Sequence, residues 1–176
     1  MNVETLNKLY AYNRWANEQV WECVATLPEV DYMAEHDYST GSVFEQVFHM
    51  MQYDWWLIHL LNNDVPPYDD LAWPQQDDYK DRDTLWKKWQ EINTDIMIYL
   101  DKVTDVDLQK SVQFPVPEGY DAMFCPTWEL HMIGINHGTN HRAQVLALLH
   151  KRGGKTEEQG YFYHILARET AAKSTT

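Results

Sequence analysis

The chain has 176 residues, 44% of them apolar, and 14 basic against 27 acidic residues give a net charge of −13. This size and composition predict one globular domain rather than a disordered chain. So negative a chain, without a Lys/Arg cluster, disfavours nucleic acid and anionic membranes as partners. No run of 18 apolar residues occurs, the first ten residues lack a signal-peptide core, and Cys23 and Cys125 form no CxxC pair. We therefore expect a cytoplasmic protein.

The first half of the chain contains two segments with the apolar periodicity of helices. The first is predicted over residues 3–27, where Pro28 ends it. The second begins at a capping box formed by Ser42 and Glu45 and continues to about residue 62. Residues 64–80 then form a long acidic connection containing prolines. Such a connection is uncommon in a compact domain unless it crosses the bundle or carries function.

The second half is predicted to contain two more long helices, separated by a short irregular region. The third helix covers about residues 83–103, and the fourth covers 126–152 and stops at a Gly-Gly pair. Between them, residues 111–116 and 122–125 flank a turn and are expected to form a small hairpin or an irregular loop.

A second capping box, at residues 156–159, predicts a final helix over 157–172, followed by a frayed tail over 173–176. The order of elements predicts an all-α fold with a single domain over residues 1–172. This domain is a four-helix bundle with a long crossover between helices 2 and 3 and a short extra C-terminal helix.

The centre of the fourth predicted helix has the pattern of a metal site. His137 and His141 are four residues apart, so a helix places both imidazoles on one face, a turn apart. Gly134 and Gly138 interrupt this helix, at a cost of roughly 1 kcal/mol each relative to alanine. A locally unfavourable sequence inside a well-specified helix indicates function. Gly138 replaces the glutamate of the His-Glu-x-x-His protease motif, and the absence of Glu-x-x-His excludes a di-iron carboxylate site.

A third ligand must come from another part of the chain. On the second predicted helix, His49 lies in the middle of the apolar pattern and is the best candidate. At about 100° per residue, the other histidines fall on a different face, near a helix end or outside the long helices: His131, His150, His59, His36 and His164. For each histidine, a buried hydrogen-bonded residue without metal is the alternative interpretation.

Three segments of the sequence resemble the DinB/YfiT-like family of proposed metalloenzymes, in an order and spacing that span nearly the whole chain. These segments are Tyr12-Asn-Arg-Trp-Ala-Asn17, residues 41–49 ending at the first histidine, and residues 136–145 with the pattern His-x3-His-Arg-x-Gln. The resemblance implies a bundle with an unusual crossover, a frequent homodimer, and one metal held by His49, His137 and His141. Residues 160–164 depart from the family, which usually has an acidic residue ahead of its last helix, so no role is transferred there.

Three neutral imidazoles leave coordination positions open, and imidazole suits several divalent metals. We expect one ion, most readily zinc or nickel, with iron as an alternative. Because some relatives are thiol transferases, the leading hypothesis is a metal-dependent transferase that acts with a small thiol. The alternatives are a non-catalytic metal-binding or stress-response protein, and a helical domain without metal. Arg142 could position an anionic group or form a salt bridge, and Tyr53 could orient a ligand or only pack.

Overall fold

The computed structural model describes residues 1–37, 41–62, 72–114, 121 and 123–174. Its elements follow one another along the chain as α1 (Val3–Ala25), α2 (Glu29–Tyr32), α3 (Val43–Leu61), the 3-10 turn η2 (Gln76–Tyr79), α4 (Arg82–Leu100), the 3-10 turn η3 (Asp107–Gln109), β1 (Ser111–Phe114), β2 (Met123–Pro126), α5 (Thr127–Lys151) and α6 (Tyr161–Ser174). The predicted mainly helical fold is confirmed.

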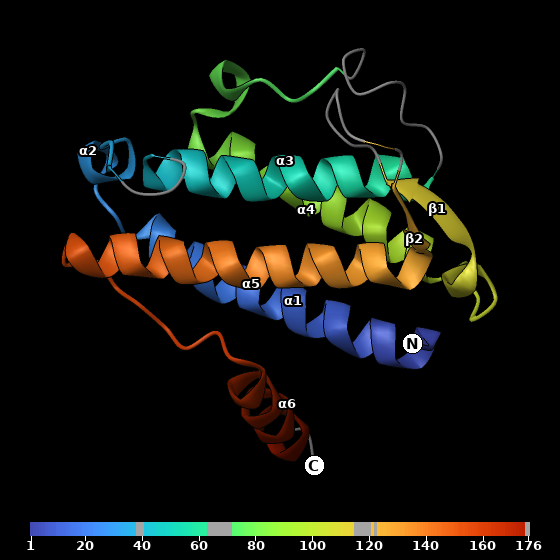
Figure 1. Cartoon of the computed structure of the whole chain (residues 1–176). Helices are drawn as coiled ribbons and strands as arrows, with labels where there is room; N and C mark the ends of the chain where they lie inside the picture. Colours follow the sequence, from blue (N-terminus) through green and yellow to red (C-terminus); the bar gives the residue numbers. More distant parts are fainter. Residues whose placement is uncertain (38–40, 63–71, 115–120, 122, 175–176) are drawn as a thin grey trace.

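The four long helices α1, α3, α4 and α5 form the bundle (Figure 1). Helix α3 packs against both α4 and α5, and α1 packs against α5 and α4. Figure 1 shows that α1 and α5 run in one direction and that α3 and α4 run in the other. Because α3 and α4 are consecutive and parallel, the chain must return along the bundle between them. This topology accounts for the long connection, of which residues 63–71 lie outside the described part.

Side-chain caps fix where the long helices begin. Ser42 and Glu45 form the predicted capping box of α3: the Ser42 amide donates to the Glu45 carboxylate at 2.7 Å, and the Glu45 amide donates to Ser42 Oγ at 3.1 Å. Asn2 and Asp81 cap α1 and α4 by their side chains alone, which accept hydrogen bonds from the amides of Thr5 and Thr84. Helix α5 ends as predicted, because Gly153 adopts a φ of 70°, a left-handed conformation that favours glycine.

Three details differ from the sequence-based expectation or complete it. A one-turn helix, α2, follows Pro28 and was not predicted. The segment before α5 is a hairpin, with β1 antiparallel to β2, although its turn lies outside the described residues. The predicted capping box at residues 156–159 is wrong, and α6 begins only at Tyr161. The Gln159 side chain instead accepts a hydrogen bond from Arg142 Nε at 2.7 Å, so a tertiary contact replaces the local cap.

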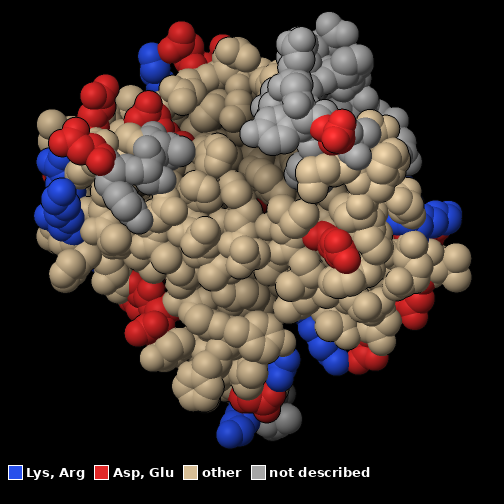
Figure 2. Space-filling view, viewed as in Figure 1, with Lys and Arg blue, Asp and Glu red and all other residues tan. Residues whose placement is uncertain are grey.

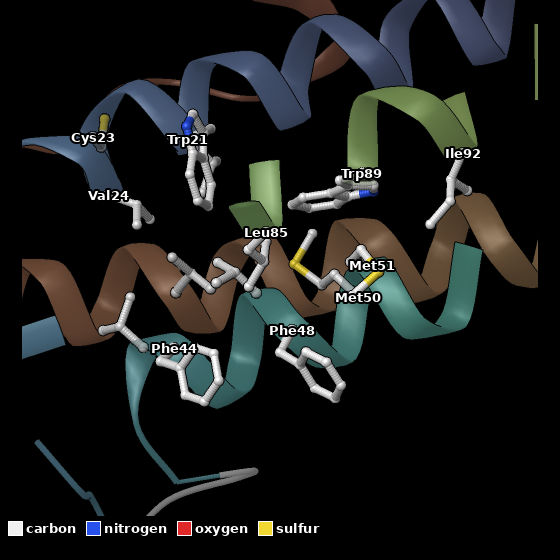
Figure 3. Close-up of a cluster of buried hydrophobic side chains, with 14 of the residues drawn as sticks. Trp21, Cys23, Val24, Phe44, Phe48, Met50, Met51, Leu85, Trp89 and Ile92 are labelled. Carbon is white, nitrogen blue, oxygen red and sulfur yellow. The ribbon is translucent and has the colours of Figure 1, made fainter. Parts of the chain in front are cut away.

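The hydrophobic core lies between the four long helices (Figure 3). Trp21 from α1 stacks on Trp86 from α4 at 4.8 Å between ring centroids, and Trp89 fills the space beside them. Helix α3 contributes Phe44 and Phe48. The same core includes Ile135 and Val145 of α5, so it joins α5 to the other three long helices. No helix in the described part of the chain is long and apolar enough to cross a bilayer.

Candidate metal centre

The structure brings His49, His137 and His141 together between α3 and α5. One ring nitrogen from each lies within 4.8 Å of the others, and the Nε2 atoms of His49 and His137 are 3.1 Å apart. All three side chains are half-buried. Among the described residues, this is the single cluster of histidine, cysteine or carboxylate side chains with the spacing of a metal site. The predicted ligand set is therefore assembled, although the sequence separates His49 from His137 by 88 residues.

Gln46 orients one of these histidines. His141 Nδ1 lies 2.9 Å from Gln46 Oε1. A carbonyl oxygen only accepts, so Nδ1 carries the hydrogen and donates it, and Nε2 keeps its lone pair for a ligand. Gln46 is completely buried and lies one turn before His49 on α3. Gln46 was not predicted as a site residue, although it lies three residues before a candidate ligand on the same helix, and this spacing was a usable signal.

Tyr53 holds the second histidine. Its ring stacks on the His137 imidazole, with 3.9 Å between centroids and 21° between planes. Close contact between α3 and α5 makes this possible, because a Cβ built on Gly134 would lie only 2.8 Å from Leu57 Cδ2 and 3.5 Å from Tyr53 Cε1. Of the two alternatives for Tyr53, the structure shows packing, and this packing restricts the orientation of His137.

Burial lowers the pKa of all three imidazoles. The pKa of His137 falls to about 3, first through burial and then through the neighbouring His141 and His49. Burial also lowers the pKa of His141, to about 4, and the neighbouring His49 lowers it further. Burial lowers the pKa of His49 as well. At neutral pH all three rings are therefore neutral, which is the form that binds a metal ion.

The donor set fits a divalent metal ion. Tetrahedral coordination at about 2.0–2.1 Å per nitrogen places two ligand nitrogens about 3.3 Å apart, close to the His49–His137 separation. Two buried polar atoms on the residues that hold the ligands, Gln46 Nε2 and Tyr53 OH, have no hydrogen-bond partner among the described residues. Buried polar groups are usually paired, and a polar group held at the cluster could supply the missing partners.

Arg142 directly follows His141 but points into the protein interior. Its guanidinium is completely buried and donates to Asn13 Oδ1, Asn17 Oδ1 and Gln159 Oε1 at 2.7 Å each, with further bonds to Thr139 and Tyr12. No carboxylate of the described residues lies within ion-pair distance. The salt bridge considered for Arg142 is thus absent from the described part, and neutral oxygens hold the cation between α1, α5 and the segment before α6.

The remaining histidines lie outside the cluster. His131 is fully buried, and its Nδ1 lies 2.9 Å from the Tyr10 hydroxyl. His59 packs against Trp55 near the end of α3. The other three lie at the exposed end of α5, in the segment after α2, and on α6 against Trp15: His150, His36 and His164.

The fold and the cluster define a class of protein: a four-helix bundle in which two facing helices present three neutral imidazoles that can hold one metal ion. A sequence model of the DinB family matches residues 1–171. The chain is 23% identical over 170 residues to Protein DinB of Bacillus subtilis (strain 168), covering 93% of this chain and 95% of that protein. A crystal structure of a DinB-like protein from Bacillus cereus ATCC 10987 matches with a TM-score of 0.66 and 18% identity, over 89% of this chain and 97% of that one.

The chain belongs to the DinB family. The resemblance noted in the three sequence segments is thereby confirmed. Two of those segments meet in the structure, because Arg142 of the third segment binds Asn13 and Asn17 of the first. The remaining segment, on α3, supplies His49 and the residue that orients His141.

Proposed function

We propose that this protein binds one divalent metal ion through His49, His137 and His141 and acts as a metal-dependent transferase that activates a small thiol. The observation that carries the metal part is the convergence of three neutral imidazoles with one ring already oriented by Gln46. Three nitrogen ligands leave at least one coordination position for a substrate. Zinc and nickel are the ions that this donor set suits best, with iron as an alternative.

The thiol part rests on the donor chemistry and on the resemblance to a family that includes thiol transferases. When bound, the ion would lower the pKa of a thiol that it coordinates. In the proposed reaction the thiolate sulfur forms a bond to an electrophilic carbon. The bond from that carbon to its leaving group breaks with its electron pair, and the thiol proton goes to solvent. The chain's own residues keep the ligands neutral and fixed: burial maintains the uncharged imidazoles, and Gln46 and Tyr53 restrict two of the rings.

Metal analysis of the purified chain tests the site. We expect about one divalent ion per chain, and loss of most of it in His137→Ala and in His141→Ala, because two imidazoles hold an ion far less tightly than three. His150→Ala removes an exposed histidine from the same helix and is the matched control. Unchanged metal content in both site variants would show that the site proposal is wrong.

Thiol consumption then separates an enzyme from a metal-binding protein. The metal-loaded protein is incubated with a panel of low-molecular-weight thiols and an electrophilic acceptor, with and without a chelator. We expect turnover that the chelator abolishes and that added metal restores. A protein that binds metal but shows no chelator-sensitive turnover with any thiol would be a non-catalytic metal-binding member of the family.

A further inference from the structure

The guanidinium of Arg142 depends on acceptors from outside its own helix. All of its N–H groups have a hydrogen-bond acceptor, and the side chain is completely buried. Thr139 belongs to α5, whereas the other acceptors come from α1 and from the segment before α6: Asn13, Asn17, Tyr12 and Gln159. These neutral oxygens stabilise the buried charge in place of a counter-ion, so the loss of one leaves a buried donor unpaired.

Arg142 lies on the turn of α5 that carries two of the histidines. It directly follows His141, and its guanidinium lies against the helix at Gly138, where a built Cβ would be 3.0 Å from Arg142 Nη1. Gly138 in turn directly follows His137. Toward α3, His141 Nδ1 donates to Gln46 Oε1 at 2.9 Å. This turn is therefore held by α3 on one side and by the Arg142 contacts on another, and a shift of the guanidinium would move the backbone that places both imidazoles.

Two contacts link Arg142 to α6. Gln159 lies just before α6 begins at Tyr161, and it accepts from Arg142 Nε at 2.7 Å. Tyr12 of α1 makes the second link, because its hydroxyl accepts from Arg142 Nη2 at 3.5 Å. The ring of Tyr12 also packs edge-on against Tyr161 and His164 of α6, with 5.1 Å and 6.0 Å between ring centroids. The position of α6 therefore affects two of the acceptors that hold the guanidinium.

Helix α6 is only weakly held on the rest of the chain. Figure 1 shows it below α5, joined to the bundle by residues 152–160, and in Figure 2 it protrudes from the lower part of the molecule. None of its described residues is buried. A helix of 14 residues is marginal in water without extensive packing, and elements with few buried contacts open before the rest of a protein does. We therefore expect α6 to exchange between a docked and an undocked state.

We propose that Arg142 is a positioning residue for His137 and His141, and that it couples the docking of α6 to metal binding. This coupling rests on the three-histidine site proposed above. When α6 undocks, it withdraws Gln159, and Arg142 either keeps a buried donor without an acceptor or moves outward to recover one. Both responses loosen the turn of α5 that carries two ligands. Because coupling between two sites is reciprocal, a metal ion that fixes this turn also favours the docked state of α6.

Competition titration of the full chain with zinc and a chromophoric chelator tests the coupling. Gln159→Leu removes the acceptor at a similar volume and should weaken zinc binding about fivefold or more. Glu158→Leu introduces the same residue at the neighbouring exposed position and is the matched control, which should leave the affinity unchanged. Gln159→Glu keeps an acceptor oxygen for Arg142 Nε and should bind zinc at least as tightly as the unmodified chain. Far-UV circular dichroism verifies that the variants are folded.

Amide hydrogen exchange of α6 gives the reciprocal readout, which a general loss of stability would not reproduce. Zinc should slow exchange over residues 161–174 of the unmodified chain by about fivefold or more, and this protection should be lost in Gln159→Leu. Equal zinc affinities for Gln159→Leu and Glu158→Leu would overturn the coupling, as would exchange in α6 that zinc leaves unchanged. An unmodified chain that binds no zinc would instead refute the metal site on which the coupling rests.

Discussion

A single buried amide determines which nitrogen of His141 faces the histidine cluster. Gln46 Oε1 accepts from Nδ1 at 2.9 Å, and Nε2 is left as the donor atom for a ligand. Without this contact the ring could rotate and exchange tautomers, and binding a metal would then include the cost of ordering it. Residues of this kind affect metal affinity although they do not touch the ion.

Gln46→Leu should therefore weaken metal binding without removing the site. Leucine has a similar volume and no acceptor, and loss of such a partner typically costs 10–100-fold in metal affinity, so we expect about this factor. Competition titration against a chromophoric chelator measures it. Gln52→Leu on the same helix is the control, because the Gln52 amide donates to the Pro74 carbonyl. Equal affinities for the two variants would show that Gln46 does not orient His141.

His131 shows what a buried histidine outside the cluster does to stability. Burial lowers the pKa of His131 to about 4, from the ordinary value of 6.5. Between these pH values the unfolded chain binds a proton at this position and the folded chain does not. The free energy of unfolding should therefore fall as the pH falls from 6.5 to 4, by up to about 3 kcal/mol from this residue.

His131→Gln should remove this contribution, while its amide oxygen can still accept from Tyr10. Urea unfolding of both proteins from pH 7 to pH 4 measures the difference. As the pH falls, the free energy of unfolding of the variant should rise relative to that of the unmodified chain. Asp54 affects stability in the opposite direction, because burial raises the pKa of its carboxyl to about 6. Both proteins contain Asp54, so the comparison isolates the contribution of His131. Parallel pH profiles would contradict the prediction.

At the scale of elements, Gly134 and Gly138 of α5 allow close packing with neighbouring side chains. Their presence inside a helix had been interpreted only as an indication of function. A Cβ on Gly134 would lie 2.8 Å from Leu57 Cδ2 of α3. A Cβ on Gly138 would lie 3.0 Å from Arg142 Nη1 and 3.1 Å from Asn13 Oδ1. The first glycine thus lets α3 approach α5, and the second leaves room for the Arg142 contact with α1. The locally unfavourable helix is compensated by these two close approaches.

Gly134→Ala should destabilise the protein, although alanine is the better helix former. The added methyl group overlaps Leu57 Cδ2, so the buried Leu57 side chain must leave its place between α3 and α5, and overpacking of this kind costs about 1–3 kcal/mol. Urea unfolding measures this cost, and metal affinity should fall with it, because the two helices carry the ligands. Asn140→Ala, at an exposed position of the same helix, is the control and should be neutral or slightly stabilising. A Gly134→Ala protein more stable than the unmodified chain would contradict this account.

At the scale of the whole molecule, the packing of the helices decides which side chains meet at the site. Helix α3 packs against α5 as well as against α4, so His49 on α3 meets the pair of histidines on α5. Arg142 joins α1, α5 and the segment that leads to α6 through neutral acceptors.

Features that depend on neighbours along the chain could be predicted from the amino-acid sequence. Apolar periodicity and caps located the four long helices, because helix formation depends on residues three and four positions apart. The same local geometry placed His137 and His141 on one face and removed His131 and His150, since a helix fixes the angle between its side chains. His49 was favoured by its position in an apolar pattern and was chosen with the help of family resemblance.

Features that depend on contacts between elements became visible only in the folded chain. The roles of Gln46, Tyr53, Gly134 and Gly138 follow from how closely α3 and α1 approach α5, a distance that the sequence does not state. The start of α6 was mispredicted for the same reason, because Gln159 binds Arg142 instead of capping a helix. Short-range geometry sets the local patterns. Burial keeps the three imidazoles neutral, and Gln46 and Tyr53 contact two of them, but both effects arise only when distant segments pack together.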